Sequence, residues 1–312
     1  MLKKYALLIL FLLGMQPDLF SQEIKIFKLA DFDLRGNVKS CLVRTDYGKE
    51  EFDFDKEGRL TKSVTRYSDQ DYDITRYRYE NEELIEKRVE NYRDNVFDKS
   101  ISIANFYTID SLPKRKITEE IISYTKEFLE RNEYHYDTDG NLVKIVHTDN
   151  DGVDETAVTY ETINEETTQT FTLNGVVQKS VRTSSRTTEN DSIERLVLTK
   201  KFVDGAPYTA TEEIYNAEQR LVSQTEFKYD EKAKQLIASK TIGYDYDALG
   251  TLVGTATRIG NTSSSKTYIY QFDNGQEGEN ANWIKQIITP ENAYSTRRVK
   301  YYQITPTSVV VE

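Results

Sequence analysis

Carboxylates are the most plentiful side chains in this chain that could do chemistry. The sequence holds 52 Asp and Glu residues and two histidines. Two carboxyl groups about 5–9.5 Å apart in a cleft would be the arrangement of a glycoside hydrolase, but nothing in the sequence singles out such a pair. His135 and His147 lie in strand-like runs, and we interpret them as polar strand residues. No nucleophile elbow, phosphate-binding glycine loop or His-rich metal motif is present. We therefore expect no enzyme, with an acidic-pair hydrolase as the alternative.

One short acidic run could bind a metal ion. Asp149, Asp151 and Asp154 alternate with other residues around Gly152, and oxygen ligands spaced in this way suit calcium. Counted from Asp149, however, the twelfth position of an EF-hand loop is Tyr160 instead of Glu. The run predicts either a weak calcium site or, in our preferred interpretation, an acidic hairpin tip. We expect no other cofactor.

Aromatic side chains could bind a sugar. The chain has 22 tyrosines, 13 phenylalanines and one tryptophan, and their rings offer flat apolar faces with polar rims. The alternative, which we favour, is that the rings pack on one another within a sheet. The residues that we select as candidate ligand contacts are Trp283, Tyr134 and Tyr244.

A repeated seven-residue pattern must position these side chains. It consists of an aromatic residue, then Asp, then Gly three residues after the Asp, then an apolar residue two positions further on. Full copies occupy residues 32–38, 54–60, 136–142 and 246–252. Degraded copies begin at Tyr77, Phe171, Tyr215 and Phe227. The Asp and Gly residues of the full copies are Asp33 and Gly36, Asp55 and Gly58, Asp137 and Gly140, and Asp247 and Gly250.

The pattern has the chemistry of a tight hairpin turn. Asp at the first position of a type I turn can bond its own backbone, and Gly at the fourth tolerates the left-handed conformation. Together they specify a three-residue hairpin loop with a G1 bulge. Phe54 then lies directly opposite Leu60 on one face of the sheet, a pairing worth roughly 0.2–1 kcal/mol. Unrelated hairpins with similar turn chemistry are the alternative to a true repeat.

The predicted fold is all-β: one elongated, twisted antiparallel sheet of consecutive β-hairpins over residues 22–302, followed by a tail at 303–312. Residues 31–96 are expected to form hairpins in succession, beginning with the copy at 32–38. Residues 97–133 are the least certain part, because Ile117, Ile121 and Tyr124 fall at helical spacing. We favour strands there, since hairpins flank the region on both sides.

The first 21 residues predict a secretory signal peptide. Lys3 and Lys4 precede a largely apolar run at 5–15, and Ser21 suits a cleavage site before Gln22. The run is shorter than the about 20 residues that a membrane-spanning helix needs, so an uncleaved anchor is the minor alternative. The chain is expected in the periplasm, at the cell surface or in the medium, without a lipid anchor at the cleavage site and without a later transmembrane segment.

The net charge argues against nucleic acid as a partner, and the single cysteine argues against an internal disulfide. The formal net charge is −11, so the chain has no electrostatic reason to bind nucleic acid. Cys41 is the only cysteine; it lies in a strand-like run and is predicted to be buried there, with no internal disulfide. Glycans and proteins of the cell envelope remain as expected partners.

The pattern resembles that of the YD-repeat (RHS-type) proteins. The resemblance rests on Tyr-His-Tyr-Asp-Thr-Asp-Gly-Asn-Leu at 134–142 and Tyr-Asp-Tyr-Asp-Ala-Leu-Gly-Thr-Leu at 244–252. Residues 34–40 are similar to the opening of small exported Bacteroidetes-type members, and residues 282–285 with 297–302 are similar to their closing segment. Only ten residues follow Tyr302, so the toxin domain of larger members is not expected. The resemblance implies a non-enzymatic exported repeat module that binds a glycan or protein partner or has a structural role in the envelope.

Overall fold

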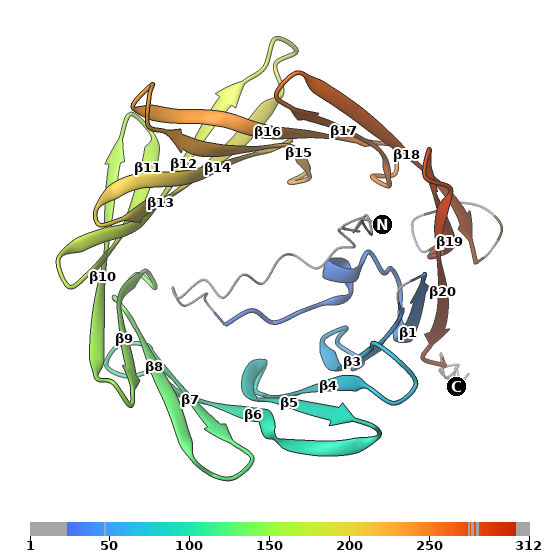
Figure 1. The fold of residues 1–312 in the computed structure, drawn as a ribbon, viewed down its shortest axis with the longest axis horizontal. Helices are drawn as coiled ribbons and strands as arrows, with labels where there is room; N and C mark the ends of the chain where they lie inside the picture. Colours follow the sequence, from blue (N-terminus) through green and yellow to red (C-terminus); the bar gives the residue numbers. More distant parts are fainter. Residues whose placement is uncertain (1–23, 47, 274, 276–277, 279–280, 304–312) are drawn as a thin grey trace, which may run out of the picture.

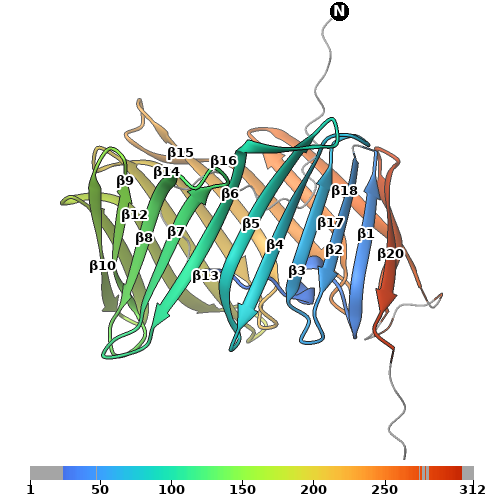
Figure 2. The same cartoon turned by 90° about the horizontal axis from the view of Figure 1, so that it is seen from below.

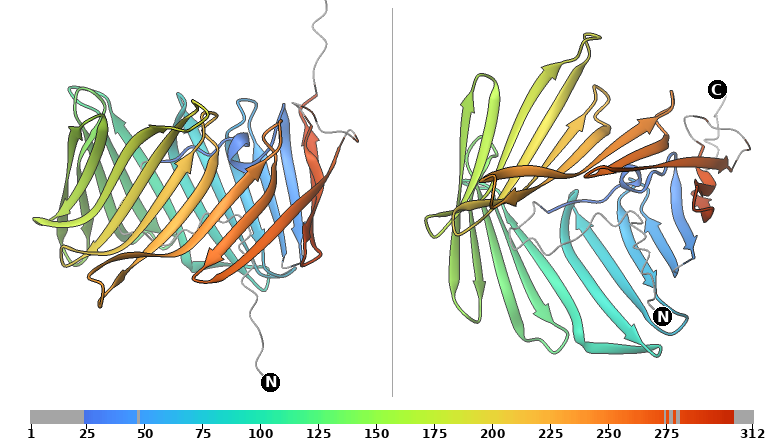
Figure 3. Two further views of the ribbon diagram at one scale, coloured as in Figure 1. Left: turned by 90° about the horizontal axis from the view of Figure 1, so that it is seen from above. Right: turned by 45° about the horizontal axis from the view of Figure 1, so that its top comes forward.

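The computed structural model is a closed antiparallel β-barrel. It describes residues 24–303 except 47, 274, 276–277 and 279–280. Twenty strands in this part of the chain each pair with the next, and β20 (Ala293–Tyr301) pairs with β1 (Val38–Thr45), which closes the sheet (Figure 1). The strands tilt relative to the barrel axis (Figures 2 and 3). The remaining strands are β2 (Gly48–Phe54), β3 (Leu60–Arg66), β4 (Tyr72–Glu80), β5 (Glu83–Arg93), β6 (Val96–Asp110), β7 (Lys116–Ser123), β8 (Phe128–Tyr136), β9 (Leu142–Asp149), β10 (Val153–Ile163), β11 (Glu166–Leu173), β12 (Val176–Thr187), β13 (Ile193–Val203), β14 (Ala206–Tyr215), β15 (Leu221–Asp230), β16 (Gln235–Tyr246), β17 (Leu252–Ile259), β18 (Thr262–Phe272) and β19 (Trp283–Thr289).

The predicted open sheet is therefore wrong, and so is the YD-repeat architecture that the resemblance implied. The finding that overturns both is the pairing of β1 with β20, in which Cys41 lies opposite Val299 and Val43 opposite Arg297. Strands twist, and a sheet of more than about 10 strands tends to curl or split. An open sheet of twenty strands would also leave two unpaired edges, which closure removes.

Three of the four full copies of the pattern are hairpin turns. The register pairs the aromatic residue with the aliphatic one in each, and it shifts by one residue beside the aromatic, as a bulge requires. The Asp carboxylate accepts a hydrogen bond of 2.8–2.9 Å from the backbone N–H of the residue after Gly. The paired residues are Phe54 with Leu60, Tyr136 with Leu142, and Tyr246 with Leu252.

The first full copy is not a hairpin, contrary to the prediction. Phe32 ends a 3-10 helix, η1 (Leu29–Phe32), and Asp33 follows it with a left-handed φ of 51°. No described strand precedes this copy, so its turn has nothing to pair with β1. Residues 97–133, in contrast, form strands β6, β7 and most of β8, as favoured from the sequence.

The degraded copies divide between the two ends of the barrel. Turns that follow even-numbered strands lie at one end, and turns that follow odd-numbered strands lie at the other, because the chain runs up and down. The copies that begin at Tyr77 and Tyr215 follow β4 and β14 and share the end of the full copies. Those that begin at Phe171 and Phe227 follow β11 and β15 and lie at the opposite end.

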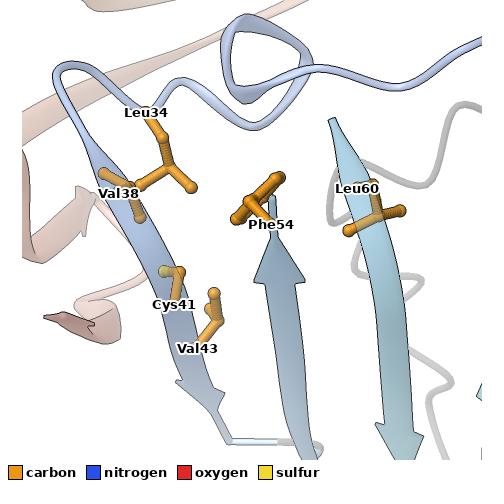
Figure 4. Close-up of a cluster of buried hydrophobic side chains, with 6 residues drawn as sticks. All are labelled: Leu34, Val38, Cys41, Val43, Phe54 and Leu60. Atoms are coloured by element: carbon orange, nitrogen blue, oxygen red, sulfur yellow. The ribbon is translucent and has the colours of Figure 1, made fainter. Parts of the chain in front are cut away.

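The aromatic residues of the full copies face the inside of the barrel. The N-terminal segment, residues 24–37, lies inside it (Figure 1). The Phe32 ring packs against Phe52 and Phe54, with centroids 4.7 and 5.3 Å apart. Since successive strand residues alternate between faces, this contact assigns the inner and outer side of every strand through the register. A buried cluster forms where the segment meets β1–β3, made of Leu34, Val38, Cys41, Val43, Phe54 and Leu60 (Figure 4).

The N-terminal segment makes one repeat turn less tolerant of a Gly→Ala substitution than another. Gly58 and Gly140 occupy the same position of the pattern, with φ of 76° and 85°. Gly140→Ala is expected to cost about 1 kcal/mol, because a side chain disfavours the left-handed region. Gly58→Ala should cost more, since its new Cβ would lie 3.1 Å from Leu29 Cδ1, whereas Gly140 has no atom within 4 Å. Urea unfolding of both variants measures the difference; equal losses would mean that the segment does not pack on this turn.

Candidate ligand-binding lumen

The N-terminal segment packs against the inner wall of the barrel. Leu29 donates its backbone N–H to Gly58 O (3.0 Å), and Leu60 donates to Phe27 O (2.9 Å). The Phe27 ring meets Tyr77 edge-on, with centroids 6.2 Å apart. Further along, Ile24 packs on a second buried cluster, made of Ile117, Tyr134, Tyr136, Ile145, Val158 and Phe171. This part of the lumen therefore holds a segment of the protein's own chain.

A group of polar side chains ties the segment to the strands that close the barrel. Asn282, 1% exposed, accepts a hydrogen bond from the Arg35 backbone N–H (2.9 Å) and donates to Arg35 O (2.8 Å). It also donates to the Tyr301 hydroxyl (2.8 Å). The Trp283 indole N–H donates to Asp33 Oδ2 (2.8 Å). We call these residues, with Arg297, the seam cluster.

Arg297 completes the seam cluster from β20. Its guanidinium lies 3.5 Å from the centroid of the Trp283 ring and donates to the backbone oxygens of Phe32 (3.0 Å) and Asp33 (3.1 Å). Burial lowers the pKa of Arg297 from its ordinary value, while the ring and the two carbonyls offset part of the cost of burying the charge. Arg35, from the segment that resembles a repeat opening, thus lies next to Asn282, from the segment that resembles a repeat closing. They meet beside the pairing of β1 with β20, which we call the seam.

A second polar cluster lies on the inner face of β6–β8, around Glu119. Its Oε1 accepts hydrogen bonds from Asn105 Nδ2 and the Tyr107 hydroxyl, both at 2.8 Å. Its Oε2 accepts from Asn132 Nδ2 and the Tyr134 hydroxyl, both at 3.3 Å. Burial, and then the Glu119 charge, raises the pKa of both tyrosines far above the ordinary value. These side chains stay neutral and act as hydrogen-bond donors.

The inner wall of β10–β18 carries tyrosines that are held by polar partners. The register places all of them on the inward face of their strands. Each hydroxyl is 2.8–3.3 Å from an amide, carboxyl or hydroxyl group of the same face. The pairs are Tyr160 with Gln169, Tyr215 with Glu213, Tyr244 with Gln224, and Tyr268 with Thr255. We call this part of the barrel the tyrosine wall.

The outer face of β2–β13 is charged. Among the described residues, nine ion pairs link neighbouring strands there, with N–O distances of 2.7–4.0 Å. They are Lys62–Asp53, Arg66–Glu51, Arg76–Glu90, Arg78–Glu86, Lys116–Asp110, Arg131–Glu120, Lys144–Glu155, Arg182–Glu166 and Arg186–Glu194. A charge on a lipid-facing strand costs about 2–4 kcal/mol at the middle of a bilayer. The arrangement suits contact with water.

The structure separates the candidate ligand contacts. Tyr134 lies in the Glu119 cluster and is 2% exposed, Trp283 lies in the seam cluster and is 7% exposed, and Tyr244 lies on the tyrosine wall. All three face inward, but they belong to three different parts of the lumen.

The acidic run lies at the turn between β9 and β10. Asp149 Oδ1 accepts hydrogen bonds from the backbone N–H of Asp151 (2.8 Å) and of Gly152 (3.0 Å). Asp154 accepts one from Asn174 Nδ2 (2.9 Å). Within the described ranges, no group of three or more His, Cys, Asp or Glu side chains is placed to hold a metal ion.

Sequence reasoning missed Glu119 and Asn282. A signal for Glu119 was present, because alternation puts it on the same face as Ile117 and Ile121, and an acid on an apolar face needs partners. Asn282 carried no such signal, since its partners are backbone groups at residue 35, which only the closure of the barrel brings near.

Comparisons with known proteins give no family. No family model matches the sequence, and no curated protein matches it. Solved structures that resemble the fold include a porin-like protein from Bacteroides uniformis, 8% identical, with a TM-score of 0.32 over 85% of this chain and 99% of that one. Another is a porin-like protein from Bacteroides vulgatus, 10% identical, with a TM-score of 0.24 over 86% and 99%. Structural similarity at this level gives no basis for assigning a function.

In the part of the chain that the structure describes, no helix is long and apolar enough to cross a membrane.

Proposed function

We propose that this chain is a non-enzymatic barrel of the cell envelope that stands in water and binds a glycan on its tyrosine wall. The observation that carries the proposal is the contrast between the two faces. The outer face has cross-strand ion pairs, whereas the inner face has ordered rings with hydrogen-bonding partners. The predicted signal peptide, which lies outside the described residues, supports export.

A glycan suits the tyrosine wall better than other ligands of the envelope. A sugar ring presents apolar C–H faces and hydroxyl edges, which match an aromatic ring flanked by polar groups. Gln224 beside Tyr244 and Glu213 beside Tyr215 can each form hydrogen bonds beyond those they make to the hydroxyls. Rings already held in place lose little conformational freedom when a ligand binds.

A protein partner is disfavoured by the closure of the sheet. Extended peptides commonly bind by adding a strand to a free sheet edge. Every described strand of this barrel has a neighbour on both sides, so no such edge is offered. A partner would have to enter the lumen or bind over ion-paired strands.

A glycan array with the protein from residue 22 onward, purified without detergent, tests the proposal. We expect saturable binding of a soluble glycan that is recovered uncleaved. Tyr244→Ala should weaken the binding at least tenfold, while Tyr294→Ala, on the outer face and 52% exposed, should leave it unchanged; circular dichroism establishes that both variants are folded. A silent array, cleavage of the bound glycan or equal effects of the two variants would refute glycan binding on the tyrosine wall.

The location of the barrel is tested separately with liposomes. In flotation assays the protein should remain in the aqueous fraction, because insertion would bring paired charges such as Arg66 and Glu51 into the bilayer. Stable insertion with the strands intact would contradict a water-facing outer wall.

A further inference from the structure

We infer that the glycan carries an amino group and that Glu213, on the tyrosine wall, binds the ammonium form of that group. Glu213 belongs to β14 and faces the lumen, because it lies two residues before Tyr215 on the same side of the strand. The inference rests on the proposed function, since it names the class of sugar that the same wall would take.

The carboxylate of Glu213 is not neutralised by a neighbouring cation. Among the described residues, its side chain makes one hydrogen bond, in which the Tyr215 hydroxyl donates to Oε2 (3.0 Å), and no ion pair. Two other carboxylates of the inner face have more partners. Glu119 accepts four hydrogen bonds, and Glu226 bonds Lys240 Nζ at 2.9 Å. Glu213 therefore keeps its charge and an acceptor oxygen for a ligand.

Two cations of the inner face flank this part of the wall, and each is bound to another group. Arg195 lies directly opposite Tyr215, with its guanidinium 4.2 Å from the centroid of that ring. Its Nε donates to Gln219 Oε1 (3.0 Å), so the guanidinium is held toward the turn that follows β14. Lys240 is paired with Glu226.

An aromatic ring lies beside the carboxylate. Gln224 of β15 is directly opposite Glu213, and its Oε1 accepts a hydrogen bond of 3.2 Å from the Tyr244 hydroxyl. In the described part of the chain, no cation is placed over the ring of Tyr244. An ammonium group is attracted to the face of an aromatic ring as well as to a carboxylate. Tyr244 and Glu213 can therefore recognise the same charge.

The charge of Glu213 acts on both tyrosines. Burial, and then the Glu213 charge, raises the pKa of Tyr215 to about 12. Burial, Tyr246 and Glu213 raise the pKa of Tyr244 to about 12 as well. Both phenols stay neutral at neutral pH, so the charge that a ligand meets there is that of the carboxylate. The net charge of the chain, −11, also favours a cationic ligand.

An amine on a sugar fits this geometry better than a metal ion. Calcium takes about six to eight oxygen ligands, and no group of three or more His, Cys, Asp or Glu side chains in the described ranges is placed to hold a metal ion. A protonated amine needs one carboxylate and can donate its other N–H groups to neutral acceptors such as Gln224. The sugar ring that carries the amine has the apolar face that an aromatic ring binds.

The test compares an oligosaccharide of glucosamine with its N-acetylated form by titration calorimetry, at about pH 6, below the ordinary pKa of a primary amine. Acetylation removes the charge of the amine. We expect the amine form to bind at least tenfold more tightly to the unaltered protein, with a preference that falls between about 50 and 200 mM salt. Glu213→Gln, which keeps an acceptor for the Tyr215 hydroxyl, should abolish the preference. Glu212→Gln is the matched control and should retain it, because Glu212 is adjacent in sequence but faces outward.

The outcomes separate the inference from the proposed function. Equal binding of the two oligosaccharides, or the same preference in Glu213→Gln and Glu212→Gln, both folded by circular dichroism, would refute the ammonium site and leave glycan binding intact. A sugar-free diamine is the second probe. If it binds and requires Glu213 while neither oligosaccharide binds, the ammonium site is supported and glycan binding is refuted. If no probe binds, both are refuted.

Discussion

Glu119→Ala is expected to lower the free energy of unfolding by about 2–4 kcal/mol. The carboxylate accepts four hydrogen bonds, from Asn105, Tyr107, Asn132 and Tyr134. Donors left without a partner in a buried position each cost about 1–3 kcal/mol, although some can turn toward water. Asn105, 5% exposed, and Tyr134, 2% exposed, have little access to it. Urea unfolding followed by circular dichroism gives the value.

The matched control is the next residue. Glu120 faces outward and forms an ion pair of 4.0 Å with Arg131, in which both side chains are nearly half exposed. An exposed pair contributes about 0–1 kcal/mol, so Glu120→Ala should have a small effect. Similar losses from the two variants would contradict the assignment of inner and outer faces on β7.

Asn282→Ala is expected to destabilise the protein by about 2–4 kcal/mol. The side chain satisfies both backbone groups of Arg35 and bonds the Tyr301 hydroxyl. Alanine would leave both backbone groups of Arg35 without this partner and would remove two of the hydrogen bonds that tie the N-terminal segment to the strands that close the barrel. Trp283, the only tryptophan, is the neighbouring residue, so its fluorescence should shift to longer wavelength at denaturant concentrations below the main transition.

Asn261→Ala, in the exposed turn between β17 and β18, is the control for this variant. It should leave both the stability and the tryptophan spectrum unchanged. If Asn282→Ala unfolds at the same urea concentration as the unaltered protein, the seam cluster does not hold the barrel closed.

Local structure could be predicted from the sequence because its causes are local. The turn chemistry of Asp55 and Gly58 is enough to specify the reversal of the chain and the pairing of Phe54 with Leu60. The same chemistry failed at Asp33 and Gly36, because the described residues before this copy form no strand that could pair with β1. The pattern specifies a turn, but it does not specify what the turn connects.

The closure of the barrel could not be predicted, because no local pattern specifies whether the two ends of a sheet meet. The seam depends on contacts such as Trp283 with Asp33, which join residues 250 positions apart in the sequence. The lumen exists only because the sheet closes, so its lining could not be predicted either. Trp283 was selected as a ligand contact on its type alone, whereas in the structure its indole N–H bonds Asp33 and its ring lies against Arg297.

The single seam also sets an order of assembly. Of the twenty pairings between the described strands, nineteen join strands that follow one another in the chain. The remaining one, between β1 and β20, joins residues as far apart as Val43 and Arg297. Loop-closure entropy grows by about 0.6 kcal/mol for each doubling of the separation. Joining ends roughly 250 residues apart thus costs about 3 kcal/mol more than closing a hairpin of about ten residues. We therefore expect the hairpins to form first and the pairing of β1 with β20, beside the segment that lies in the lumen, to form last.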